Sequence, residues 1–403
     1  MAERRWRPRP IERLRLSRHL FITVLNQAAV GGFFLNLAPV TSDLVRDLGA
    51  TYADVGLATT LFILGQVAAS VPAGYLSDRF GVKRIYLAAN VATLLAALLL
   101  ALARSMGEVL FLRFVLGTAM GTQFVVGSSY LAFWSPPGKT ALYQGIYGSG
   151  FNFGIALSFL LAGPQVALLG WRGVFLAPGV ASLLSTALIW AAGREPPKKP
   201  GAPSMSLRRL QDLPMGALSL LGVSMAAAWG TFVVLGAWLT EYLVVAREGA
   251  LWLSSVLTGI NVAGSGLGRI LGGVVAKPGR ESRAILWFYA IVIATAAGMT
   301  LPAGLPVLLT LGFLVVTAAS MGFAPSIRLC IQVSEPALQG TAVGYLLALG
   351  MVLASSLPTV FGWVVEATGS FAAGFGVVVA APAAGLLAML RVQARHLRPE
   401  SGP

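Results

Sequence analysis

The sequence is dominated by apolar runs that are each about as long as a bilayer is thick. An α-helix needs about 20 mostly apolar residues to cross the hydrocarbon core of a membrane. Only 11% of the 403 residues are charged, whereas soluble domains carry about 25%. We therefore predict an all-α membrane protein with twelve transmembrane helices. The twelve segments span residues 19–40, 53–76, 84–103, 109–133, 140–163, 172–192, 214–240, 251–276, 284–303, 305–329, 338–365 and 371–391.

A polar connector near the middle of the chain separates two sets of six apolar segments. Residues 194–212 are rich in proline, glycine, lysine and arginine, the composition of a flexible linker. Each segment before the connector has a counterpart about 200 positions later, and such internal repeats are typical of membrane transporters. We expect two six-helix bundles, residues 1–193 and 213–403, joined by the linker 194–212.

The basic residues are distributed unevenly between the connectors. With the N-terminus inside, 22 of the 29 lysines and arginines fall in cytoplasmic segments. Because positive residues concentrate on the cytoplasmic side of membrane proteins, both termini and the linker are predicted to be cytoplasmic, in a plasma (inner) membrane. The formal charge of +14 reflects this distribution and does not indicate a nucleic-acid-binding surface. Four arginines are predicted outside and three within spans: Arg46, Arg104, Arg172 and Arg247, then Arg113, Arg269 and Arg328.

Residues suited to catalysis or metal binding are scarce. The single cysteine, Cys330, lies inside an apolar run, and the two histidines, His19 and His396, lie near the chain ends. A disulfide framework and a multi-cysteine metal site are thereby excluded, and no nucleophile, base and metal ligands cluster together. We predict no enzymatic activity, no metal and no cofactor. The expected partners are the lipid bilayer and a small molecule, with no nucleic acid, and the protein is expected to be a monomer.

One short motif stands between the second and third apolar segments. Residues 74–84 read GYLSDRFGVKR, which resembles the GxxxDRxGxKR loop of the major facilitator superfamily at every defined position. Physically, the glycines permit close helix approach and a tight turn, and the cations hold the loop inside. The resemblance implies the fold of that superfamily, alternating access, and a charge latch formed by Asp78 and Arg79. The predicted latch residues are Gly74, Asp78, Arg79, Gly81, Lys83 and Arg84.

Two further segments resemble elements of the same superfamily. Residues 273–280 repeat the loop motif only in part, because Lys277 stands where the aspartate would be. In the fourth segment, Arg113, Gly117 and Gly121 resemble an RxxxGxxxG element and share one helix face, where small residues favour helix packing. The fifth segment lacks the GPxxGG stretch typical of drug/proton antiporters, which counts against drug efflux.

Charged residues within the spans are functional candidates, because a charge in lipid is costly. No Asp, Glu or His lies deep in a predicted span, since Asp43, Asp54, Glu241 and Glu366 lie at or near helix ends. Strict coupling to a proton gradient is therefore not expected, although a carboxylate near an end, such as Glu241, remains a coupling candidate.

Arg269 is the span arginine with the strongest functional prediction. It follows Asn261 and Ser265 at four-residue spacing on one helix face. Residues 266–273 look like the eighth-helix arginine segment of oxalate/formate and monocarboxylate carriers, which implies that Arg269 holds a substrate carboxylate; the alternative is a packing or snorkelling arginine. Arg113 and Arg328 are interpreted as structural.

These observations lead to one function and one alternative. We predict a transporter of a small organic or inorganic anion, such as a monocarboxylate, a dicarboxylate or a nitrate-like ion. The alternative is efflux of amphipathic drugs or metabolites. Other polar or aromatic residues of the spans are candidates for the cavity wall, although each is equally suited to bridging helices. They are Asn26, Gln27, Gln66, Gln123, Tyr147, Asn152 and Trp229.

Overall fold

The computed structural model describes residues 10–135, 140–196, 213–276, 279–301, 304–335 and 338–396, and within these residues it contains helices and no strands. Each of the twelve predicted spans is mostly helical over its described residues. The elements before the connector are α1 (Pro10–Phe34), η1 (Ala38–Val40), α2 (Thr41–Leu48), α3 (Tyr52–Phe80), α4 (Val82–Ala101), α5 (Met106–Trp134), α6 (Thr140–Leu169), η2 (Gly170–Phe175) and α7 (Leu176–Ala192).

The elements after the connector are also helices. They are α8 (Met215–Glu241), the π-helical turn η4 (Tyr242–Ala246), α9 (Leu251–Val275), α10 (Glu281–Met299), α11 (Leu305–Met321), α12 (Phe323–Gln332), α13 (Gln339–Ser355), α14 (Leu357–Thr368) and α15 (Phe371–His396).

Ten stretches of the described residues are long and apolar enough to cross a membrane. One of them, Tyr143–Ala192, contains most of α6 and all of α7, and α9 is not among the ten. Helix α9 contains several glycines and serines and Arg269, which lower its hydropathy although its length suffices. The protein is a multi-pass membrane protein with the predicted twelve-helix arrangement.

Two predicted spans are each divided into a pair of consecutive helices. Segment 305–329 divides at Gly322 into α11 and α12, and segment 338–365 divides at Ser356 into α13 and α14. Each division is followed within three residues by a proline, Pro325 or Pro358. A proline lacks the N–H donor and clashes with the carbonyl four residues earlier, so the hydrogen-bond ladder is interrupted one turn before it.

The start of α3 is defined by a reciprocal cap. The Thr51 side chain accepts a hydrogen bond from the backbone N–H of Asp54, and the Asp54 carboxylate accepts one from the backbone N–H of Thr51, both at 3.0 Å. This capping box satisfies two donors that a helix terminus leaves unpaired. Asp54, one of the few acidic residues near a span, therefore has a structural role.

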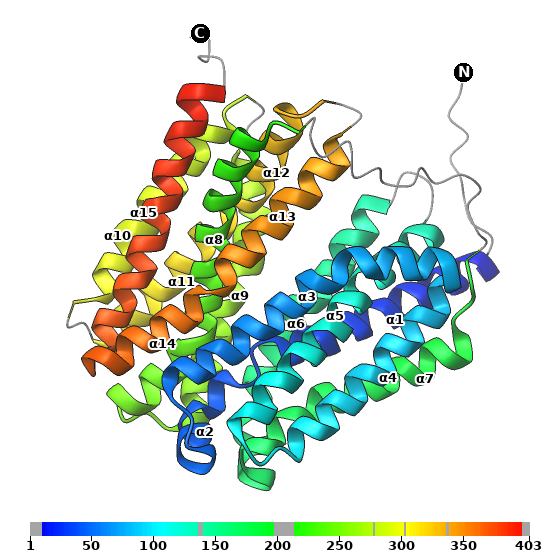
Figure 1. Cartoon of the computed structure of the whole chain (residues 1–403), viewed down its shortest axis with the longest axis horizontal. Helices are drawn as coiled ribbons and strands as arrows, with labels where there is room; N and C mark the ends of the chain where they lie inside the picture. The colour runs from blue at the N-terminus through cyan, green and yellow to red at the C-terminus, as the bar shows by residue number, and fades with distance from the viewer. Residues whose placement is uncertain are drawn as a thin grey trace.

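The helices form two groups that lie side by side in Figure 1. In the first group (α1–α7), α3 packs on α5 and α1 packs on α6 and α7; in the second (α8–α15), α8 packs on α13 and α15, and α9 packs on α11. The groups meet where α3 packs on α14 and α6 packs on α9. The predicted linker lies mostly outside the described residues, so the domain boundaries stay a prediction.

The two ends of the molecule differ in how the groups meet. We call the end where α1 begins and α15 ends the terminal end, and the opposite end the far end (Figure 1). Among the described residues, every hydrogen bond between the groups lies at the far end, including those of Thr60 with Ser355 and, at 2.8 Å, with Thr359. The groups are therefore held together by hydrogen bonds at the far end.

Candidate functional site

A small cavity lies beside Arg269 within the second group of helices. Its volume is about 20 Å³, enough for a group of about the size of water. Helices α8, α9, α11 and α12 all contribute to its wall, and no Asp or Glu is part of it. The wall consists of Met225, Ala228, Trp229, Phe232, Arg269, Ala319, Ser320, Gly322, Phe323 and Ser326.

The Arg269 guanidinium has no polar partner among the described residues. Its central carbon lies 4.8 Å from the centre of the Phe323 ring, a cation–π distance. No hydrogen bond or ion pair within the described part of the chain involves its nitrogens. A guanidinium carries five N–H donors in a planar fork. The cavity therefore combines unused donors, a positive charge and an aromatic wall, with room for about one water-sized group.

Arg113, unlike the partly exposed Arg269, is buried, and its donors are used. It is fully enclosed and donates to the carbonyl oxygens of Phe33 at 2.8 Å and Phe34 at 3.0 Å, and to Asn36 Oδ1 at 3.3 Å. Its guanidinium also lies 4.3 Å from the centre of the Phe62 ring. These contacts tie α5 to α1 and α3, and they support a structural role.

Arg328 is likewise engaged by the backbone. Its guanidinium donates to the carbonyl oxygen of Ala276 at 2.8 Å, at the C-terminus of α9, and to that of Gly273 at 3.4 Å. The last carbonyls of a helix lack intrahelical partners. Arg328 therefore caps α9, and of the three span arginines Arg269 alone lacks a hydrogen-bond acceptor among the described residues.

Gly117 and Gly121 lie where α5 crosses α3. A Cβ atom at Gly117 would lie 2.0 Å from the carbonyl oxygen of Phe62, and one at Gly121 would lie 2.5 Å from that of Gln66. Any larger residue would force the two helices apart. The structure supports the predicted packing role of both glycines.

Asn261 and Ser265 are placed differently from Arg269. Both are buried and neither lines the cavity. Asn261 lies against α11, where a Cβ at Gly312 would be 2.5 Å from Asn261 Oδ1. Asn261 Nδ2 donates to the Leu257 carbonyl at 3.1 Å, while Asn261 Oδ1 and Ser265 Oγ have no partner among the described residues. Residues four apart on an α-helix differ in direction by about 40° around the helix axis. The side chains of Asn261, Ser265 and Arg269 therefore point in increasingly different directions. Their shared role in substrate binding stays a prediction.

Asn26 and Gln123 belong to a buried network inside the first group. Asn26 Nδ2 donates to Asn90 Oδ1 at 2.7 Å and to Gln123 Oε1 at 2.9 Å, and Tyr86 OH donates to Asn26 Oδ1 at 2.8 Å. Ser185 of α7 also accepts from Asn26. The side chains of this network hold α1, α4, α5 and α7 together. Asn90, Tyr86 and Ser185 are missing from the sequence-based site, although an asparagine within an apolar run was a usable signal.

The remaining candidates differ in how well their polar groups are satisfied. Tyr147 OH donates to the carbonyl of Phe124 at 3.0 Å and so links α6 to α5. Gln27 is fully buried with no partner for either amide atom among the described residues, and Asn152 Oδ1 is also unpartnered. Trp229 lines the Arg269 cavity and lies 6.0 Å, centre to centre, from Phe34 of the first group.

The motif loop at residues 74–84 lies at the terminal end, where no hydrogen bond joins the two groups among the described residues. Gly81 has φ of +99°, in the region that favours glycine. Asp78 is exposed and has no partner among the described residues, and Arg79 contacts only its helical neighbours Tyr75 and Phe80. A Cβ at Gly74 would meet no neighbour within 4 Å, so its predicted helix contact is absent in this conformation. The latch itself stays a prediction.

Glu195 is a member of this loop region that sequence analysis missed. Its Oε2 accepts a hydrogen bond at 3.1 Å from the backbone N–H of Lys83, at the start of α4. Lys83 Nζ in turn donates to the carbonyl of Trp190 at 3.0 Å. A carboxylate is stabilised at a helix N-terminus by unpaired N–H groups and the helix dipole. Residues 74–84 are therefore anchored to the end of α7.

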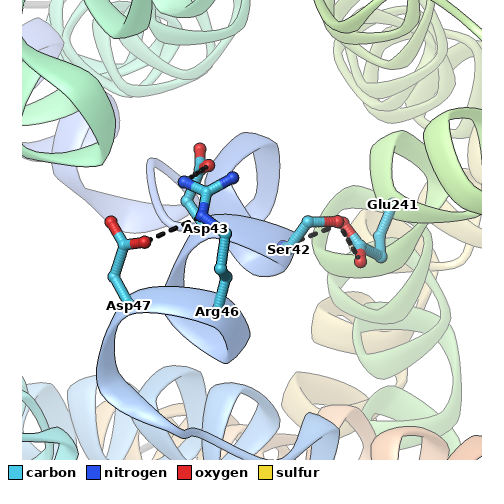
Figure 2. A network of polar contacts seen from close by, with 5 residues as sticks. All are labelled: Ser42, Asp43, Arg46, Asp47 and Glu241. Carbon is cyan, nitrogen blue, oxygen red and sulfur yellow. Dashed lines mark hydrogen bonds and ion pairs between the residues drawn. The ribbon is translucent and has the colours of Figure 1, made fainter.

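A buried carboxylate closes the far end. Glu241 is 2% exposed and lies between the groups. Its carboxylate accepts hydrogen bonds from Ser42 Oγ at 2.7 Å, the backbone N–H of Ser42 at 3.2 Å and Tyr52 OH at 3.3 Å. Figure 2 shows Ser42 meeting Glu241, while Arg46 turns to Asp43 and Asp47, at 2.6 and 2.8 Å.

Comparison with known proteins agrees with this architecture. The family model described as Major Facilitator Superfamily matches residues 20–358. The chain is 24% identical over 277 residues to the "Probable nitrate/nitrite antiporter NarK1" of Thermus thermophilus, covering 66% of this chain and 62% of that protein. It is 27% identical over 386 residues to the "Probable sulfoacetate transporter SauU" of Cupriavidus necator, covering 87% and 88%.

The fold also matches a solved structure. A bacterial homologue of the human lysosomal transporter Spinster, in an inward-facing and occupied conformation, superposes with a TM-score of 0.78 at 17% sequence identity, over 97% of this chain and 98% of that chain. At this identity the likeness concerns the fold alone. The family model nevertheless covers most of the chain, the motif loop included, and the chain belongs to the Major Facilitator Superfamily of membrane transporters.

Proposed function

We propose that the protein carries a small anion across the inner membrane by alternating access, with Arg269 as the group that binds the anion. The observation that carries this proposal is the guanidinium of Arg269, which has no acceptor among the described residues and faces a cavity without carboxylates. Guanidinium pairs with carboxylate, and with other planar oxoanions, through two parallel hydrogen bonds. The names of the relatives, a nitrate/nitrite antiporter and a sulfoacetate transporter, support an anionic substrate.

The orientation forms part of the proposal. With the terminal end in the cytoplasm, as the distribution of lysine and arginine predicts, the far-end contacts of Glu241 and Thr60 close the protein toward the outside. The conformation is then inward-facing. Reporter fusions at Arg194 and at the C-terminus are both expected to report a cytoplasmic location, and an external signal from either would overturn this orientation.

A binding screen of the purified protein tests the substrate class. A ligand that binds the folded state raises its apparent stability by mass action. Nitrate, a sulfonate and a set of mono- and dicarboxylates are compared with sugars, amino acids and amphipathic cations by thermal shift. Stabilisation by an anion that is lost in Arg269→Ala and kept in Arg328→Ala supports the proposal.

The aromatic residues of the cavity wall also support an alternative function. Trp229, Phe232 and Phe323 line the cavity beside the guanidinium. Aromatic rings also suit amphipathic solutes, so efflux of such compounds is the second candidate. Stabilisation by amphipathic drugs alone, unchanged by Arg269→Ala, would favour it and remove the anion proposal.

A further inference from the structure

Two serines in the wall of the Arg269 cavity carry hydroxyl groups that make no hydrogen bond within the described part of the chain. Ser320 is the penultimate residue of α11, and Ser326 is the fourth residue of α12 and is 3% exposed. In contrast, Ser70 and Ser129 donate to the carbonyl oxygen four residues earlier, at 2.9 and 3.1 Å, and Ser334, just after α12, does so at 2.6 Å. Each cavity serine therefore keeps an unused donor.

Both serines lie close to Arg269. The Phe323 ring lies 4.8 Å from the central guanidinium carbon, and Ser326 shares a face of α12 with Phe323 because it follows by three residues. On α11, a Cβ at Gly268, the residue before Arg269, would lie 2.9 Å from Ser320 Cβ. Because the cavity holds about one water-sized group, the two serines and Arg269 surround the same small volume.

The division between α11 and α12 allows both serines to line one cavity. On an uninterrupted α-helix, residues six apart point about 120° away from each other. The helix is divided between Ser320 and Ser326 at Gly322, shortly before Pro325, which lacks an N–H donor. The interruption that the sequence imposes on this span thus brings two hydroxyl groups to the cavity of Arg269.

The donors around the cavity match the acceptors of an oxoanion. A carboxylate has two oxygens with about four lone-pair sites. The guanidinium fork fills two of these sites with parallel hydrogen bonds, and two serine hydroxyls, with one donor each, fill the other two. A halide ion is spherical and has no fixed acceptor directions for such a set.

We propose that Ser320 and Ser326 donate hydrogen bonds to the anion that Arg269 binds, and that they select an oxoanion head, such as a carboxylate or nitrate, over a halide. This inference rests on the function proposed for Arg269 and deepens it by naming the contacts from α11 and α12. A buried hydroxyl without a partner lowers the stability of the folded protein, and a bound oxoanion would supply the missing acceptors.

The test compares the binding of formate, nitrate, methanesulfonate and bromide by the purified full-length protein, by thermal shift and by titration. Ser320→Ala with Ser326→Ala should weaken binding of the preferred oxoanion about thirtyfold and reduce its preference over bromide about tenfold, because hydrogen bonds to a charged group are the stronger ones. Without added anion, the double variant should be at least as stable as the wild type, because it removes two unpaired hydroxyls. Lower affinity without lower stability separates a ligand contact from a structural role.

Ser334→Ala is the matched control, because its hydroxyl already donates to the Cys330 carbonyl. It should be slightly less stable and bind the same anion with unchanged affinity. If the double variant does not fold, Ser326→Ala alone should lose about fivefold in affinity.

The two proposals fail in different ways. If the wild type binds none of the four anions, or binds them equally well in Arg269→Ala, the proposed function falls and the serine contacts fall with it. If binding depends on Arg269 but is unchanged in the serine variants, or falls equally in Ser334→Ala, only the serine contacts are overturned. An unchanged preference for the oxoanion over bromide would also overturn them.

Discussion

The surroundings of Arg113 and Arg269 show two ways in which a membrane protein accommodates an arginine within a span. Around Arg113, carbonyl oxygens of α1 and the amide of Asn36 accept its hydrogen bonds, within a group of helices that also contains the Asn26 network. Around Arg269, one aromatic ring covers the guanidinium and no acceptor is present among the described residues. An arginine at the centre of a helix costs about 2.5–3.5 kcal/mol on insertion scales. At Arg113 the protein offsets this cost internally, whereas at Arg269 we infer that a cavity and its ligand offset it.

The largest expected effect tests the Arg269 side of the comparison. Arg269→Lys keeps the charge but removes the planar fork, which lysine does not reproduce. Anion uptake by reconstituted protein should fall about 100-fold, equivalent to about 3 kcal/mol, with little change in thermal stability. Arg328→Lys is the matched control, because a lysine can still donate to the carbonyl of Ala276. Near-native anion uptake by Arg269→Lys would show that Arg269 is structural, and the difference in role between Arg269 and Arg113 would no longer hold.

The second prediction tests the Arg113 side. Arg113→Leu leaves the carbonyls of Phe33 and Phe34 without their donor in a fully buried place, and losing one member of a buried polar set costs about 3 kcal/mol or more. Thermal unfolding in detergent should shift to clearly lower temperature, with reduced yield. The remaining folded protein should bind anions with unchanged affinity. A stable variant that has lost anion binding would assign Arg113 to the substrate site.

A smaller effect is expected within the Asn26 network. Interhelical hydrogen bonds in membrane proteins contribute about 0.6 kcal/mol each on average. Asn26→Ala removes contacts with Asn90, Gln123 and Ser185, so we expect a loss of about 1–2 kcal/mol in unfolding free energy and little change in the KM for the transported anion. A KM that rises tenfold at unchanged stability would restore Asn26 and Gln123 as substrate contacts.

The smallest effects concern the balance between the two ends. Glu241→Ala removes up to three hydrogen bonds that join the groups at the far end, each contributing about 0.5–1.5 kcal/mol. The variant should shift toward the conformation that is open at the far end, by about tenfold in population. Spin labels at Asp47 and Ala367, in a background with Cys330→Ser, should report longer distances. Glu241→Gln, which keeps the size and hydrogen-bonding capacity, should shift less.

Asp78→Asn should shift the same balance in the opposite direction. Asp78 has no partner among the described residues in this conformation, and the latch implied by residues 74–84 would engage in the conformation in which the groups meet at the terminal end. Removing its charge should therefore favour the present conformation and slow transport without weakening substrate binding. Unchanged transport kinetics and label distances in Asp78→Asn would remove the latch.

The sequence by itself determined the helices, the membrane class and the family. Span length and apolarity are properties of consecutive residues, so twelve segments and a motif such as residues 74–84 are readable without knowing what packs where. Even the divided helices at Gly322 and Ser356 have a local cause, because Pro325 and Pro358 interrupt the hydrogen-bond ladder nearby.

Only the tertiary structure decided which polar groups are satisfied. Arg113 donates to Phe33, 80 positions away in the chain, and Ser42 donates to Glu241, 199 positions away. Helical spacing placed Asn261 and Ser265 with Arg269, yet the packing of neighbouring helices buries the first two and leaves the third beside the cavity. Whether a buried donor finds an acceptor depends on where the backbone carbonyls of other helices lie. Helix packing sets those positions, and the residue types in the sequence do not reveal them.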